Sequence, residues 1–162
     1  KYIGIVDYMK EKMPDVTITS DIIVGFPGET EEDFVELCEF VKEAKFEHMG
    51  AFPYSREEGT PAYDFDGQID EQVKQDRSDM IMTDQTLISA DKNNEKIGKT
   101  VEVLVEGYDS YIRCYFGRTE YDAPEIDGMM YFTSENKLAL GDFVKVRITD
   151  NLDNNLLGEV IS

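Results

Sequence analysis

The first 60 residues alternate between helix-like and strand-like patterns of apolar positions. Apolar side chains recur at helical spacing up to Met13, and Pro14 ends that run. Ile22, Ile23 and Val24 form a short β-branched run, typical of a parallel strand that is covered on both faces. The pattern predicts a helix over residues 1–13, a strand over 16–24, a helix over 31–45 and a strand over 48–55.

The first predicted strand leads into a tight turn and the start of a helix. Gly25 and Gly28 bracket Phe26-Pro27, so the backbone can turn where Cβ atoms would clash. Thr30 stands three residues before Asp33, which is an acidic variant of the capping box. In α/β sheets ligands bind in the loops that follow the carboxyl ends of the strands. The pattern therefore indicates a strand, turn and helix unit in a position where ligands bind.

The helix–strand–helix–strand order predicts right-handed crossovers and a parallel sheet. The charged segment Arg56–Ala62 follows the second strand and is expected on the same rim as Phe26–Glu29. A long helix should run from a cap at Asp70 to about Asn94. Its inner stripe is expected to consist of Val73, Met80, Ile81, Leu87 and Ile88.

From Ile97 onward the pattern changes to short runs of alternating apolar and polar residues. The runs cover residues 100–106, 111–116, 128–132 and 142–149. About five short strands in this length predict a small antiparallel β-barrel of the OB type. The fold class is therefore α/β followed by all-β, with a first portion over 1–67, a connecting helix over 68–96 and a barrel over 97–162.

The formal net charge of −19 over 162 residues is the most unusual bulk property. Such a field repels phosphate backbones and attracts a basic partner, although acidity that merely aids solubility explains the charge as well. The composition contains no apolar run of the roughly 20 residues that a membrane span needs. A reducing, cytoplasmic location is the simplest expectation.

The chain offers few candidates for metal binding or nucleophilic chemistry. Cys38 and Cys114 are the two thiols and stand far apart, which argues against a disulfide framework or a metal-binding pair. Cys38 falls on the apolar stripe that Phe34, Leu37 and Val41 form, so it is interpreted as a core residue. No metal ligand, catalytic nucleophile or general base is predicted in this chain.

Four segments of this sequence resemble one enzyme family. Ile23-Val-Gly-Phe-Pro-Gly-Glu-Thr-Glu-Glu-Asp-Phe34 and Phe52-Pro-Tyr-Ser-Arg-Glu-Glu-Gly-Thr-Pro-Ala62 resemble the last third of a radical S-adenosylmethionine barrel of methylthiotransferase type. Gly117-Arg-Thr-Glu-Tyr-Asp-Ala-Pro-Glu-Ile-Asp-Gly128, followed by Gly141-Asp-Phe-Val-Lys-Val, is similar to the TRAM domain of those enzymes. The third segment resembles the branch that modifies an aspartate of a small-subunit ribosomal protein, and the tRNA-modifying branch is the near relative.

The resemblance implies a chemistry that uses S-adenosylmethionine and two 4Fe-4S clusters in the full-length enzyme. Iron–sulfur clusters need thiolate ligands, and this chain has no pair of cysteines close enough to begin a cluster motif. The chain therefore resembles a C-terminal fragment, inactive by itself and with no cofactor expected bound. Lys1 in place of an initiator Met is consistent with a fragment and equally with a processed chain.

The resemblance also implies roles for individual residues. The positions expected to face the cofactor are Gly25, Phe26, Pro27, Gly28, Glu29, Phe52 and Tyr54. Those expected to bind substrate are Arg56, Glu58 and Arg118. For each set a purely structural role stays open: an ordinary tight turn, core packing, a solvated rim, or an ion pair from Arg118 to the Asp122–Asp127 loop.

The expected partner is a basic small-subunit ribosomal protein, because residues 97–162 carry six basic and twelve acidic side chains, which disfavours RNA. A tRNA methylthiotransferase fragment and a stand-alone binding module are the alternatives. Thr19 and Asn155 depart from the family pattern, and no role is assigned to either departure. An incomplete sheet leaves an open edge, so self-association or partial disorder of residues 1–20 is expected.

Overall fold

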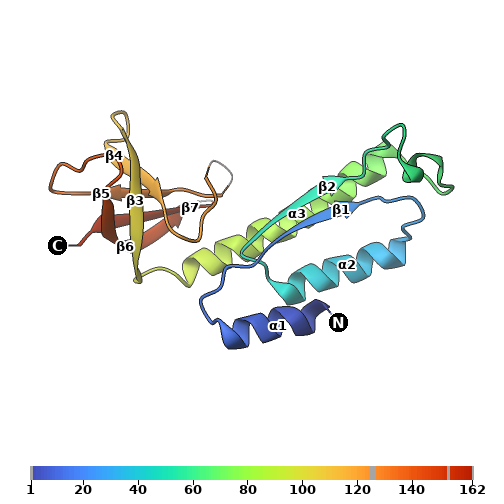
Figure 1. The fold of residues 1–162 in the computed structure, drawn as a ribbon, viewed down its shortest axis with the longest axis horizontal. Helices are drawn as coiled ribbons and strands as arrows, with labels where there is room; N and C mark the ends of the chain where they lie inside the picture. Colours follow the sequence, from blue (N-terminus) through green and yellow to red (C-terminus); the bar gives the residue numbers. More distant parts are fainter. Residues whose placement is uncertain (1, 125–126, 153, 162) are drawn as a thin grey trace. The chain divides into compact units, whose positions relative to one another are not determined.

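The structure is a computed structural model that describes residues 2–124, 127–152 and 154–161. The chain divides into two compact units, the first ending at Ile88 and the second beginning at Ser89. Figure 1 shows an α/β arrangement in the first and a small β-barrel in the second. This confirms the fold class expected from the sequence.

The first unit follows the predicted order of elements. It comprises α1 (Tyr2–Lys12), β1 (Thr19–Val24), α2 (Glu31–Ala44), β2 (His48–Pro53), a 3₁₀ turn (Pro61–Asp64) and α3 (Glu71–Asn94), whose last turns belong to the second unit. β1 and β2 pair in parallel, with Thr19 opposite His48 and Val24 opposite Pro53. The predicted parallel pairing is thus confirmed.

β1 differs from its prediction in extent and in burial. It begins at Thr19 rather than Val16, because the Val16 N–H donates to the Met13 carbonyl in a turn after α1. The expectation that both faces of this strand are covered is wrong for the structure described here. Val24 is completely buried, but the Ile23 side chain is 61% exposed on the opposite face.

α2 matches its predicted amphipathic pattern. Phe34 and Val41 are buried, and Leu37 and Cys38 pack against the same core. The helix ends because Lys45 adopts a left-handed conformation (φ 47°), from which its N–H donates to the Val41 carbonyl. The apolar face of α2 is thereby held against the strands.

α3 begins as predicted but buries a different face. The Asp70 carboxylate accepts the Gln72 N–H at 2.9 Å, which confirms the cap. The predicted inner stripe is wrong at Val73, Met80 and Leu87, which are exposed, and right at Ile81 and Ile88, which pack into the core. The remaining buried side chains of α3 within the first unit are polar: Lys74, Arg77, Ser78 and Gln85.

Two of these polar side chains bond to backbone groups of the sheet and its connections, and the other two, Lys74 and Arg77, contact carboxylates. Ser78 Oγ donates to the Ala51 carbonyl at 2.9 Å, and Gln85 Nε2 donates to the Phe46 carbonyl at 3.1 Å. A buried carbonyl without a partner is costly, so hydroxyl and amide side chains fit this face better than apolar ones.

The second unit is a closed five-stranded barrel. Its strands are β3 (Thr100–Asp109), β4 (Cys114–Arg118), β5 (Met130–Thr133), β6 (Phe143–Leu152) and β7 (Asn155–Val160). They close in the order β3-β4-β5-β7-β6, and β6 returns to β3. The expectation of a wholly antiparallel barrel is wrong at one pair, because β5 and β7 run parallel. This pairing places the chain's last strand between β5 and β6.

The barrel has a core of its own, formed by inward-facing positions of β3, β5, β6 and β7. Its buried members are Val103, Val105, Met130, Phe132, Val146, Ile148 and Leu156. Glu125 and Ile126 of the Gly117–Gly128 motif lie outside the described residues. None of the described helices is both long enough and apolar enough to cross a lipid bilayer.

Candidate functional site

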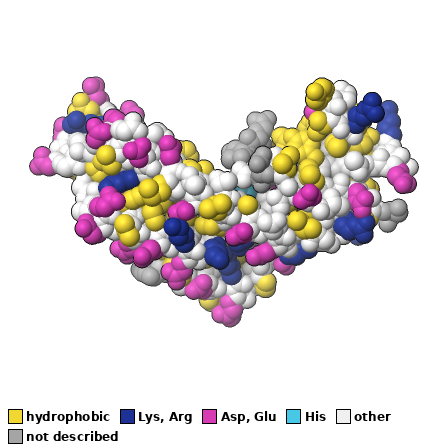
Figure 2. Space-filling model, turned by 180° about the vertical axis from the view of Figure 1, so that it is seen from behind, with side chains coloured by type: hydrophobic (Ala, Val, Ile, Leu, Met, Phe, Trp, Pro, Cys, Tyr) yellow, Lys and Arg dark blue, Asp and Glu magenta, His cyan; other side chains and the backbone are white. Residues whose placement is uncertain are grey.

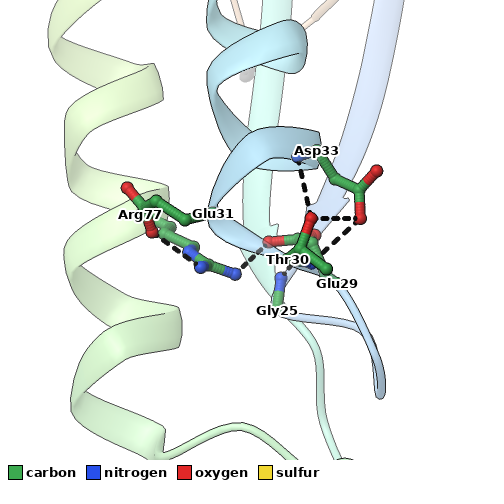
Figure 3. Close-up of polar contacts among 6 residues, drawn as sticks. All are labelled: Gly25, Glu29, Thr30, Glu31, Asp33 and Arg77. Carbon is green, nitrogen blue, oxygen red and sulfur yellow. Dashed lines mark hydrogen bonds and ion pairs between the residues drawn. The ribbon is translucent and has the colours of Figure 1, made fainter.

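The turn between β1 and α2 is the best-defined polar arrangement of the first unit (Figure 3). The Glu29 N–H donates to the Phe26 carbonyl at 2.9 Å, which closes a four-residue turn. Pro27 and Gly28 occupy its central positions, and Gly28 has φ +88°. Proline followed by a residue with positive φ is the signature of a type II turn, so the sequence specifies this conformation locally.

One backbone contact ties the turn to another part of the chain, and one side-chain contact closes the turn on itself. The Gly28 N–H donates to the Gly67 carbonyl at 3.0 Å, which holds the segment before α3 against the turn. The Gly25 N–H donates to Glu29 Oε2 at 2.9 Å. One carboxylate therefore bridges the first and last residues of the segment 25–29.

Arg77 of α3 completes this network. Its Nη1 lies 2.6 Å from Glu29 Oε1, and its Nη2 lies 3.0 Å from Glu31 Oε2. Its guanidinium also lies 5.1 Å from the ring centroid of Phe34. The Arg77 and Glu29 side chains are only 9% and 13% exposed. The two contacts of Arg77 Nη1 and Nη2 lie at hydrogen-bonding distance and offset part of the cost of burying the charges, whereas Arg77 Nε is buried without a hydrogen-bond partner among the described residues.

The start of α2 carries the predicted capping box. Thr30 Oγ1 accepts the Asp33 N–H at 3.1 Å, and the Thr30 N–H donates to Asp33 Oδ2 at 2.9 Å. The Thr30 N–H and hydroxyl, with a smaller contribution from Arg77, lower the pKa of the Asp33 carboxyl below its ordinary value of 3.8. The box thus holds Asp33 as a carboxylate.

Lys74 supports the turn from the α3 side. Its side chain is 1% exposed, and a Cβ built on Gly25 would come within 2.4 Å of Lys74 Cγ. Lys74 Nζ lies 2.6 Å from Glu71 Oε1 and 5.1 Å from the ring centroid of Tyr54. Gly25 is therefore required both by its φ of +74° and by the close approach of the lysine stem.

Two of the three aromatic residues predicted to face the cofactor, Phe52 and Tyr54, lie in different environments. Phe52 is 54% exposed and stands opposite Ile23 in the sheet register. Tyr54 is buried, and its ring meets the ring of Phe26 edge to face at 5.1 Å. The Tyr54 hydroxyl is buried without a hydrogen-bond partner among the described residues. Phe52 and Ile23 thus form an exposed apolar surface, whereas Tyr54 packs against Phe26 of the turn.

The charged segment after β2 is held mainly by contacts within itself. Arg56 Nε donates to the Tyr63 carbonyl at 2.8 Å, and the guanidinium stacks 4.4 Å from the Tyr63 ring centroid. Ser55 Oγ donates to Glu57 Oε1 at 2.5 Å. Glu58 is exposed in the same segment. These contacts order the segment and leave a substrate role for Arg56 and Glu58 as a prediction.

Arg118, the third predicted substrate residue, belongs to the barrel and is described with that unit. Its Nε lies 2.7 Å from Glu106 Oε1 of the neighbouring strand. The expected partner was the loop Asp122–Asp127, yet Asp122 instead accepts the Thr119 N–H at 3.0 Å. The observed ion pair joins β3 to β4.

Sequence reasoning missed Lys74, Arg77 and Gly67. The two cations lie outside the predicted apolar stripe of the helix, and the turn residues that they contact, Glu29 and Gly25, are more than 40 residues away in the chain. The available signal was the spacing of residues 74, 78, 81 and 85, which repeats with a helical period across polar and apolar types.

The described residues contain no group of three or more His, Cys, Asp or Glu side chains that could hold a metal ion. Burial, with a smaller contribution from the Asp84 carboxylate, raises the pKa of the Cys38 thiol. A thiol with a raised pKa is a poor nucleophile at neutral pH, in agreement with the interpretation of Cys38 as a core residue.

Comparison with known families and proteins adds to this geometry. Residues 97–161 match the TRAM domain family. The chain is 47% identical over 156 residues to the ribosomal protein uS12 methylthiotransferase RimO of Clostridioides difficile, which covers 96% of this chain and 35% of that protein. It is 45% identical over 159 residues to the protein of the same name from Acetivibrio thermocellus, covering 98% and 35%. The corresponding protein of Geobacter sulfurreducens is 45% identical over 155 residues, covering 95% and 34%. The chain thus spans about a third of the length of the relatives it matches.

Proposed function

We propose that this chain, a member of the ribosomal protein uS12 methylthiotransferase family with a TRAM domain, works as part of a radical S-adenosylmethionine enzyme that methylthiolates an aspartate of a small-subunit ribosomal protein. In this proposal residues 1–67 form part of the cofactor-binding barrel, residues 68–96 connect the two portions, and residues 97–162 dock the substrate. The similarity along 96% of the chain is the observation that carries the proposal.

The cofactor side is assigned to the rim of the two-stranded sheet. The pinned turn of Gly25, Phe26, Pro27, Gly28 and Glu29 follows β1, and Tyr54 follows β2 at the same carboxyl-terminal edge. Ligands bind at this edge in parallel α/β sheets. Exposed Phe52 and Ile23 offer an apolar surface for the adenosyl portion, and the turn offers backbone groups in fixed positions.

When bound, S-adenosylmethionine supplies the radical that removes hydrogen from the unactivated carbon, and a second cluster supplies sulfur. We assign the ligands of both 4Fe-4S clusters to the part of the relatives that this chain does not match. The chain's two cysteines stand on α2 and β4, and cluster ligation requires several thiolates at one site. The role of this chain is to bind and orient S-adenosylmethionine and the substrate, and to exclude water from them.

The docking side is assigned to the barrel. Tyr111 at the β3–β4 turn is 94% exposed, and the Asp109 carboxylate fixes that turn by accepting the Tyr111 N–H at 2.7 Å. A large exposed aromatic side chain on an ordered turn is typical of interaction sites. Because this portion of the chain is acidic, a basic polypeptide fits it better than a phosphate backbone. Action on a ribosomal protein would place the enzyme in the cytoplasm.

The decisive test measures binding of the purified chain to the basic small-subunit protein and to tRNA across a salt series. We expect binding to the protein that weakens steeply with salt, and weak binding to tRNA. Tyr111→Ser should weaken the protein complex by roughly tenfold, the usual scale for one exposed anchor. The matched control is Tyr8→Ser, an exposed tyrosine of α1. Tight tRNA binding with no protein binding would instead support the tRNA-modifying branch.

A further inference from the structure

We propose that Arg77 and Lys74 of α3 are positioning residues for the turn that faces the cofactor. They are three residues apart, are buried, and contact the two ends of the segment Gly25–Glu29. The identity of the ligand rests on the proposed function, whereas the positioning of the turn rests on the contacts of this chain alone.

Arg77 fixes the end of the turn through two carboxylates. Its fork contacts Glu29, the last residue of the turn, and Glu31, the first residue of α2. A planar guanidinium with two separate partners allows few orientations, which a lysine ammonium could not reproduce. Arg77 therefore sets how the turn enters α2.

Glu29 carries this constraint to the start of the turn. Glu29 Oε1 accepts a hydrogen bond from Arg77 Nη1 at 2.6 Å, and Glu29 Oε2 accepts one from the Gly25 N–H at 2.9 Å. A single buried carboxylate thus connects α3 to the backbone where β1 ends, as Figure 3 shows.

Lys74 restrains Gly25 by packing against it from α3. Its stem leaves no room for a Cβ at Gly25, and its ammonium lies beside the ring of Tyr54, which follows β2. The apolar part of the Lys74 side chain therefore packs against the backbone of the turn, and its ammonium group pairs with exposed Glu71. Together the two cations fix the position and orientation of the turn relative to β1 and β2.

Packing alone does not explain two charged residues at these positions. Apolar residues of similar volume often stabilise a buried site as well as an ion pair does, while charged groups with defined partners select one geometry. Val73 and Met80 on the same helix are exposed, so it is charged residues of α3, and not these apolar ones, that face the turn.

The first experiment follows the Gly25 amide in the purified chain by NMR hydrogen exchange. Arg77→Met keeps the volume and removes the fork, and we expect exchange of this amide to accelerate by roughly tenfold or more. Arg77→Lys should give an intermediate effect. The control is Lys42→Met, which also breaks an ion pair between α2 and α3, at Asp84, and should leave Gly25 unchanged. Unchanged exchange at Gly25 in folded Arg77→Met and Arg77→Lys would overturn the proposal.

The second experiment measures S-adenosylmethionine cleavage by the complete enzyme that contains this chain. A displaced turn should raise KM for S-adenosylmethionine by roughly tenfold in Arg77→Lys and in Lys74→Met, with a smaller change in kcat. A fall in kcat at constant KM would contradict a positioning role.

If the unaltered enzyme does not bind S-adenosylmethionine, the proposed function fails, and hydrogen exchange at the Gly25 amide still tests the positioning role. If Arg77→Met does not fold, Arg77→Lys and Glu29→Gln provide the same readout.

Discussion

At the scale of single residues, the two glycines of the turn have different reasons to be glycine. Gly25 and Gly28 both have positive φ, at +74° and +88°. A Cβ on Gly25 would overlap the Lys74 stem, whereas a Cβ on Gly28 would meet no atom within 4 Å. The same substitution at the two positions therefore separates backbone strain from steric overlap.

We expect Gly28→Ala to lower the free energy of unfolding by about 1–2 kcal/mol, the cost of a left-handed residue with a side chain. Gly25→Ala should cost about 1–3 kcal/mol more, because the stem of Lys74 must move. Urea unfolding of both variants measures the difference. Repeating Gly25→Ala in a Lys74→Ala background should remove most of the excess, and an equal cost in both backgrounds would contradict the packing argument.

The capping box predicts a pH dependence. Because the pKa of Asp33 is lowered in the folded chain, its contribution to stability is complete above about pH 4 and is lost as pH falls through the folded-state pKa. Asp33→Ala should therefore destabilise the chain at pH 7, and the destabilisation should shrink as the pH is lowered below about 4, measured by urea midpoints at a series of pH values. Glu32→Ala removes a charge from the same helix turn, leaves the cap in place, and should not reproduce this pattern.

Residue-level prediction from sequence succeeded where the cause is local. Gly25, Pro27 and Gly28 specify a turn, and Thr30 with Asp33 specifies a helix start, through contacts within a few residues. Arg77 could not be assigned to Glu29 in this way, because 48 residues separate them and only the folded arrangement brings them together.

At the scale of elements, α3 stabilises the sheet through hydrogen bonds in addition to the packing of Ile81 and Ile88. Ser78→Ala should leave the buried Ala51 carbonyl without its side-chain donor and cost about 1–3 kcal/mol. Thr83→Ala on the exposed face of the same helix removes a hydroxyl bonded to the Asp79 carbonyl and should cost no more than about 0.5 kcal/mol. Thermal unfolding of the two variants compares these values directly, and similar melting temperatures would contradict the assignment.

The element-level errors share one physical origin. Periodicity gives the phase of a helix but not which side faces the core, and an apolar heptad of Val73, Met80 and Leu87 pointed to the wrong side. For the same reason the run Ile22–Val24 predicted a strand correctly but overestimated how much of it is covered. Four of the barrel strands were located to within a few residues because alternation with turn residues is a strong local signal, whereas β7 (Asn155–Val160) was not located.

At the scale of the whole molecule, charge and exposed apolar surface act in opposite directions. Acidic side chains are spread over both units on the face drawn in Figure 2, beside smaller groups of basic ones. A net charge of −19 keeps copies of the chain apart at low ionic strength. Screening at physiological salt reduces that repulsion, so contacts between the exposed apolar residues of the sheet in different copies can form.

We therefore expect the purified chain to self-associate through the sheet face that carries Ile23 and Phe52, which are 61% and 54% exposed. Light scattering should show a weight-average mass that rises with protein concentration, and more steeply at higher salt. Ile23→Lys should suppress the rise.

Leu87→Lys on exposed α3 is the matched control, because each substitution changes the net charge by the same amount, from −19 to −18. A general charge effect would make the two variants equal, whereas contact through the sheet makes Ile23→Lys alone effective. A concentration-independent monomer mass in the unaltered chain at high salt would show that this surface is tolerated in water. The link between an open sheet and association would then fail.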